Sequence, residues 1–169
     1  WLADLQARIA QLNDWAANPA ETPVCTWVSG LFNPQSFLTA VMQTTAQKDN
    51  LELDKLTLLT DVTKKMLSEE MTAPAKEGTF IVGLSLEGGS WNVGAGLLEP
   101  SKPREMFTPL PVINVRPVVV DKAELGVYHC PCYKTQQRGQ TYVFSLQLRT
   151  KADTGKWVLA GVVAVMDVI

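Results

Sequence analysis

The chain has 169 residues, which is enough for one domain or two small ones. Apolar residues make up 46% of it and charged residues 19%, a composition typical of a packed core and not of disorder. The net charge of −2, without a basic block, gives little electrostatic support for nucleic-acid or anionic-membrane binding, and no apolar run reaches the ~20 residues that span a bilayer.

The start of the sequence favours a piece of a longer protein. It begins at Trp1 without a charged-then-apolar leader, and helical spacing of apolar residues starts at once. Because a natural N-terminus usually has some slack before its first helix, we expect an excised fragment. The cysteines Cys25, Cys130 and Cys132 cannot all pair with one another, so a reducing, cytosolic setting fits best.

Residues 1–72 are predicted to form a helical segment. A first helix is expected over residues 2–17, ending at Asn18-Pro19 because proline disfavours helix in the residue before it. Its spaced apolar residues are Leu2, Leu5, Ile9, Leu12 and Ala16.

A second helix is expected to begin at Asn33-Pro34, since asparagine is a good N-cap and proline suits the first helical position. It should end by Asp49-Asn50. Its buried stripe is predicted to be Phe37, Leu38, Val41 and Met42. Residues 51–62 begin like a strand, and their continuation as strand or helix stays open.

Residues 73–169 are rich in Val, Gly, Pro and aromatic residues, and they predict strands joined by short turns. The glycines after Glu87 indicate a hairpin turn. The prolines in the expected strand Pro109–Val120 predict that this strand lies at the edge of a sheet or carries a bulge. The expected strands are Thr79–Glu87, a return strand from Trp91, Pro109–Val120, Gly126–Lys134, Thr141–Arg149 and Lys156–Val168.

Two of these strands carry side-chain predictions. On Thr141–Arg149, alternation places one set of residues inward and the other outward. The inward set is Tyr142, Phe144, Leu146 and Leu148, and the outward set is Val143, Ser145, Gln147 and Arg149. Lys156–Val168 is apolar on both faces and should be covered on both sides. Together the strands predict an α+β fold, with N-terminal helices packed against a small C-terminal antiparallel β-barrel.

No catalytic, cofactor or metal site is predicted. The sequence lacks a G-x-x-x-x-G-K-[ST] phosphate loop and a G-x-S-x-G motif. The glycines of Gly88-Gly89 and Gly94-Ala95-Gly96 suit turns, and Glu69-Glu70 suits a solvated surface. The tryptophans at positions 1, 15, 27, 91 and 157 suit core or interface packing better than a ligand box.

The lone histidine, His129, lies beside Cys130 and Cys132 and invites a metal or thiol interpretation. On a strand, however, the two cysteines point to one face and His129 to the other, so the three cannot converge on a tetrahedral zinc. Core packing is the better explanation.

Four blocks in order resemble one family, the C-terminal domains of dynein heavy chains. Residues 26–43 resemble its W-x-S-G-x-F-x-P-Q-x-F-L-T-A block, and residues 83–92 resemble G-L-x-L-E-G-A-x-W-[DN]. Residues 128–135 with Arg138-Gly139 resemble Y-x-C-P-V-Y-K-T-x-x-R-G, and residues 157–162 resemble W-V-L-x-G-V. Gly89 replaces a common alanine, and Cys132 a common valine. The sequence at Asn33–Ser36 and at 63–65 is similar to that of axonemal, outer-arm-type heavy chains.

The resemblance implies a non-catalytic C-terminal module of a much longer motor protein. Such domains pack on the AAA+ ring of their own heavy chain and modulate its ATP-driven, minus-end-directed motility on microtubules in a cilium or flagellum. Other dynein subunits are partners through the parent complex. Two alternatives stay open, namely a small β-barrel that binds an apolar ligand and an enzyme that uses Cys130 or Cys132.

Overall fold

The structure is a computed structural model that describes residues 1–21, 23–119 and 124–166. Both predicted N-terminal helices are confirmed, as α1 (Leu2–Ala17) and α2 (Pro34–Asp49). Asn33 caps α2, because its side-chain oxygen accepts a hydrogen bond from the Ser36 N–H at 3.1 Å. Asn50 ends the helix in the left-handed conformation, with a φ of 52°.

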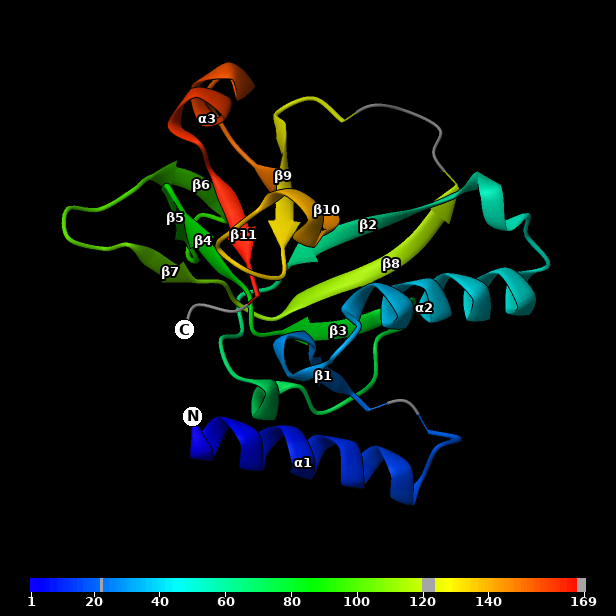
Figure 1. The fold of residues 1–169 in the computed structure, drawn as a ribbon. Coiled ribbons are helices and arrows are strands. Elements are labelled where there is room, and N and C mark those ends of the chain that lie inside the picture. Colours follow the sequence, from blue (N-terminus) through cyan, green and yellow to red (C-terminus); the bar gives the residue numbers. More distant parts are fainter. Residues whose placement is uncertain (22, 120–123, 167–169) are drawn as a thin grey trace.

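Strands of the described residues form two larger sheets and a hairpin (Figure 1). The first sheet has the order β1-β3-β8-β2, and only β1 and β3 pair in parallel. Its strands are β1 (Cys25–Trp27), β3 (Thr79–Val82), β8 (Ile113–Val119) and β2 (Leu56–Val62). Residues 51–62, left open from the sequence, therefore end in a strand after a short 3-10 turn.

The second sheet has the order β10-β9-β11-β4-β7, in which β9 and β11 are parallel. Its strands are β10 (Tyr142–Arg149), β9 (Val127–Tyr133), β11 (Val163–Val165), β4 (Ser85–Glu87) and β7 (Phe107–Pro109). The hairpin pairs β5 (Gly89–Asn92) with β6 (Leu97–Pro100). The return strand at Trp91 thus exists, but it pairs with β6 and not with the strand before the turn.

The predicted closed barrel is wrong, because no sheet of the described residues closes on itself. The physical reason is that two of the predicted strands are kinked, which the alternation of apolar and polar residues does not reveal. Predicted strand Thr79–Glu87 breaks at Gly83, whose φ is 102°, so that β3 belongs to one sheet and β4 to the other. Predicted strand Pro109–Val120 likewise breaks between β7 and β8, where the Leu110 N–H donates to the Leu84 carbonyl at 2.8 Å. Strands that bend in this way join two sheets at a corner.

Pro117 lies in β8, an interior strand, although proline was predicted to require an edge or a bulge. The pairing with β3 ends at Val115, so Pro117 lies beyond the end of that ladder. On its other side it pairs with Leu58 of β2. Leu58 and Pro117 form a non-hydrogen-bonded pair, because Thr60, two residues after Leu58, directs its N–H away from β8. The missing N–H of Pro117 therefore costs no ladder bond, and the strand can be interior. Val120, the last residue of that predicted strand, lies outside the described residues.

The predicted strand Lys156–Val168 is also wrong over its first half. Residues Thr154–Ala160 form helix α3, and only Val163–Val165 pair as β11. Asp153 caps the helix through the Gly155 N–H at 3.2 Å, and Gly161 ends it with a φ of 69°. β11 is buried on both faces as expected. Residues 167 and 168 lie outside the described residues.

A bulge corrects the side-chain assignment on β10. Tyr142 pairs with Tyr133 and Phe144 with Cys132, so Val143 is an extra residue in the ladder. Consequently Tyr142 is exposed and Val143 is buried, the reverse of the prediction. Phe144, Leu146 and Leu148 face the core as predicted.

Candidate interaction surface

Helix α1 presents its apolar stripe to solvent. Leu2, Leu5, Ile9 and Leu12 recur at helical spacing and are 62%, 38%, 49% and 38% exposed. No residue of the helix is buried. Figure 1 shows α1 at the edge of the molecule, next to β1. A contiguous apolar stripe of this kind is typical of an interaction site.

A neighbouring face of α1, which is mainly polar, holds the helix to the domain. The Gln11 amide accepts a hydrogen bond from the Trp27 N–H at 2.8 Å and donates to the Trp27 carbonyl at 3.1 Å. The Arg8 guanidinium lies 5.4 Å from the Trp27 ring centroid, and its Nε pairs with Asp4 at 2.9 Å. Trp15 packs edge-on against Phe37, with ring centroids 5.7 Å apart. These contacts fix the orientation of α1 and leave its apolar stripe free.

Helix α2 behaves differently. Of its predicted stripe, Phe37 and Leu38 are buried, whereas Val41 and Met42 are half-buried. The helix packs along β8 and β2 (Figure 1). Its apolar face therefore covers the first sheet of the same domain, and α1 supplies most of the free apolar surface of the two helices.

The cysteines and His129 are placed as strand alternation predicted. Cys130 and Cys132 are both fully buried, and His129 on the other face of β9 is exposed. Burial raises the pKa of the Cys130 thiol to about 12 and that of Cys132 further above its usual range. Cys25, far off in β1, is half-buried, and burial with the nearby Glu69 raises its pKa to about 11. None of these thiols is activated as a nucleophile.

The other singled-out residues have packing or surface positions. Within the described ranges, no group of three or more His, Cys, Asp or Glu side chains is placed to hold a metal ion. The lack of a metal site stays a prediction. Trp91 and Trp157 are buried, whereas Trp1 is exposed, as are Glu69 and Glu70. No helix of the described segments has the length and hydropathy of a membrane span.

The two glycine clusters lie at connections between strands. Gly88 forms the bend between β4 and β5, and Gly89 is the first residue of β5. Gly94-Ala95-Gly96 lies in the turn that joins β5 to β6. Neither cluster precedes a helix, so neither has the geometry of a phosphate-binding loop.

Sequence reasoning missed two sets of polar contacts. One is the attachment of α1 through Gln11, and the other is a hydrogen-bonded pair between Gln147 and Thr60 that joins the two sheets. Polar side chains at helical or strand spacing suggest a solvated face. Their partners are far away in sequence, so local spacing carries no signal for either contact.

Comparison with known proteins agrees with the four sequence blocks. The family model for the C-terminal domain of the dynein heavy chain matches residues 1–166. The "Dynein beta chain, flagellar outer arm" of Chlamydomonas reinhardtii is 52% identical over 170 residues, covering 100% of this chain and 4% of that protein. "Dynein axonemal heavy chain 17" of Homo sapiens is 43% identical over 169 residues, covering 99% of this chain and 4% of that protein.

A third relative, the "Dynein beta chain, ciliary" of Tripneustes gratilla, is 42% identical over 169 residues, again 99% of this chain and 4% of that protein. The sequence thus spans only 4% of the length of these relatives. The likeness to axonemal, outer-arm-type heavy chains is confirmed. This protein belongs to the family of C-terminal domains of dynein heavy chains.

Proposed function

We propose that this protein is a non-catalytic structural and regulatory domain, which packs on the AAA+ ring of its own dynein heavy chain. In this proposal the parent protein hydrolyses ATP and moves toward microtubule minus ends. The domain modulates that motility from its place on the ring. The complex works in the axoneme of a cilium or flagellum, together with other dynein subunits. Neither nucleic acid nor membrane is a partner.

The exposed apolar stripe of α1 is the observation that carries the proposal. Most of each relative lies outside the segment that this sequence matches. In the proposal, the rest of the same heavy chain supplies the surface that covers the stripe. Completely burying an exposed side chain of the size of Ile or Leu contributes about 1.5–3 kcal/mol, and each stripe residue, being 38–62% exposed, would contribute part of that. Four such residues in one stripe would hold α1 firmly against that surface.

The docking proposal is tested with a matched pair of substitutions in a full-length heavy chain. Ile9→Glu places a charge in the stripe, and Ala10→Glu places the same charge on the exposed neighbour about 100° around the helix. We expect Ile9→Glu to weaken docking by about 1 kcal/mol or more, because about half of the Ile9 side chain is exposed before docking. Limited proteolysis around the domain and microtubule gliding velocity are the measurements, and Ala10→Glu should leave both unchanged.

The outcomes separate packing from regulation. Equal proteolysis of the two variants and the parent would contradict docking through α1. Faster cleavage of the Ile9→Glu variant with an unaltered gliding velocity would keep the packing role and remove the regulatory one.

The non-catalytic part of the proposal has its own test. The phosphate loop is missing from the sequence, and Gly88-Gly89 and Gly94-Ala95-Gly96 connect strands to strands. Titration of the 169-residue protein with Mg-ATP in a calorimeter should give no saturable heat. A micromolar site would contradict this part of the proposal.

A further inference from the structure

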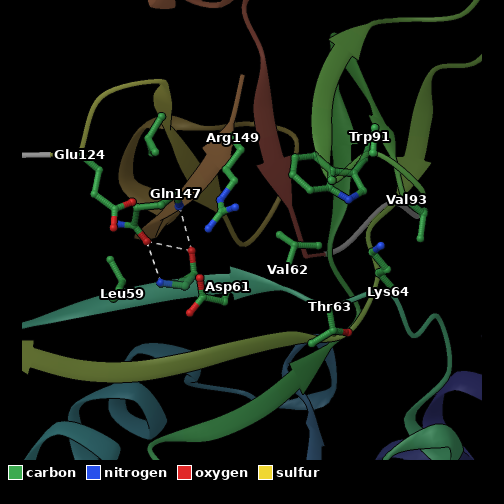
Figure 2. Close-up of a pocket in the computed structure, with 14 residues that line it drawn as sticks. Leu59, Asp61, Val62, Thr63, Lys64, Trp91, Val93, Glu124, Gln147 and Arg149 are labelled. Atoms are coloured by element: carbon green, nitrogen blue, oxygen red, sulfur yellow. Dashed lines mark hydrogen bonds between the residues drawn. The ribbon is translucent and has the colours of Figure 1, made fainter. Parts of the chain in front are cut away.

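A cavity of about 380 Å³ lies where the edges of the two sheets diverge (Figure 2). Strand β2 is the edge of one sheet and β10 the edge of the other. They meet at Thr60 and Gln147, where the Gln147 Oε1 accepts hydrogen bonds from the N–H and hydroxyl of Thr60, both at 2.8 Å. Beyond this point the walls of the cavity include the ends of both strands, 61–64 and Arg149.

Both strand ends direct backbone groups into the gap. The Thr60 N–H points away from β8, since it donates to Gln147, and so do the N–H and carbonyl of Val62 two residues later. The Gln147 N–H points away from β9, since it donates to the Thr60 hydroxyl at 2.8 Å, and the backbone groups of Arg149 follow it. Val62 and Arg149 thus offer edge groups that face the cavity and that form no hydrogen bond with another described residue.

Two cationic side chains and an apolar wall of the cavity offer contacts to an acidic residue with apolar neighbours. Lys64 and Arg149 line it, and neither forms an ion pair with another described residue. Of the two carboxylates in the lining, Asp61 is paired with Arg116 at 3.2 Å, and Glu124 is exposed. The Trp91 ring and Val93 supply an apolar wall (Figure 2).

We propose that this cleft binds a short extended segment of a partner polypeptide by strand addition. The segment hydrogen-bonds to the edge groups of Val62 or Arg149, which no other described residue pairs. A glutamate or aspartate of the segment pairs with Arg149 and Lys64, and alternate apolar residues contact Trp91 and Val93. The cleft shares no residue with the apolar stripe of α1, so this inference does not rest on docking to the ring.

The test uses defined peptides and the 15N-labelled 169-residue protein. The probe is acetyl-Thr-Val-Glu-Val-Thr-amide, and its binding is followed by amide NMR shifts. We expect saturable shifts at Val62, Lys64 and Arg149. The analogue with glutamine for glutamate should bind at least tenfold more weakly, because a charge-assisted pair is lost. An analogue with both valines N-methylated should also lose at least tenfold, because it cannot form the edge hydrogen bonds.

Protein variants sharpen the result. Arg149→Gln should weaken binding about tenfold, and the exposed Lys102→Gln, away from the cleft, should change it less than twofold. The peptide analogues decide the matter even if Arg149→Gln is poorly folded. Equal affinity for glutarate would indicate a small-carboxylate site and overturn the proposal. Shifts elsewhere on the surface, no saturation, or undiminished binding of the N-methylated peptide would also overturn it.

Discussion

Helices α1 and α2 have the same length, 16 residues each, but they use opposite kinds of surface to contact the molecule. α2 buries Phe37 and Leu38 against the first sheet. α1 is held by the Gln11 amide and by Arg8 on Trp27, and its leucines face solvent. The difference shows that an amphipathic pattern predicts a buried face without naming the surface that buries it.

The contrast between the buried face of α2 and the exposed stripe of α1 would be contradicted if leucines in the two helices contributed equally to the stability of the domain. Leu38→Ala in α2 should lower the free energy of unfolding by about 2–5 kcal/mol, because it empties a core position that is 2% exposed. Leu5→Ala in α1 should cost about 1 kcal/mol or less, because Leu5 is already 38% exposed. Urea unfolding of the two variants measures both, and similar costs would show that the stripe of α1 is buried.

The hydrogen bonds between Gln147 and Thr60, which join the two sheets, should contribute more to the free energy of unfolding than the outward-facing position of Gln147 suggests. Gln147→Ala leaves the Thr60 N–H and hydroxyl without their acceptor, so we expect a loss of about 1–3 kcal/mol. Urea unfolding is again the measurement, with Gln43→Ala on an exposed turn of α2 as a neutral control. A loss below about 0.5 kcal/mol would mean that the Gln147 side chain is effectively solvated.

The hydrogen bonds that attach α1 through Gln11 should contribute less to stability than the Gln147–Thr60 contact. Gln11→Ala removes two hydrogen bonds to the Trp27 backbone and should cost about 1 kcal/mol, because both groups are only partly buried. The loss should appear as faster hydrogen exchange of α1 amides, while exchange in β9 and β10 stays unchanged. Uniform acceleration over the whole domain would place α1 within the same cooperative unit as the sheets.

The smallest expected effect is self-association at high concentration. With Leu2, Leu5, Ile9 and Leu12 exposed, weak concentration-dependent dimerisation should be detectable by sedimentation velocity. Ile9→Glu should suppress it, and Ala10→Glu should not. Monomeric behaviour of the parent protein at all concentrations would argue that the stripe is too polar or too small to form a contact.

Several features followed from the sequence alone because they depend on neighbouring residues. The start of α2 was predicted from Asn33-Pro34, and the core side of β10 from the alternation of Phe144, Leu146 and Leu148. The burial of Cys130 and Cys132 opposite His129 followed from the same alternation. Membership of the dynein family was predicted from four blocks in order, and the family model over residues 1–166 confirmed it.

Other features were decided by tertiary contacts, and local patterns predicted them wrongly or not at all. A kink at Gly83 and a break after Pro109 divide predicted strands between two sheets, so the barrel does not close. The apolar run after Asp153 forms α3 because Trp157 is buried there and its indole N–H donates to Thr150, in addition to the local helix signals of Asp153 and Gly161 that the strand prediction did not use. The outward stripe of α1 and the cleft beside Arg149 both depend on hydrogen bonds between residues far apart in the sequence. Hydrophobic periodicity reports only local spacing, so it could not predict these contacts.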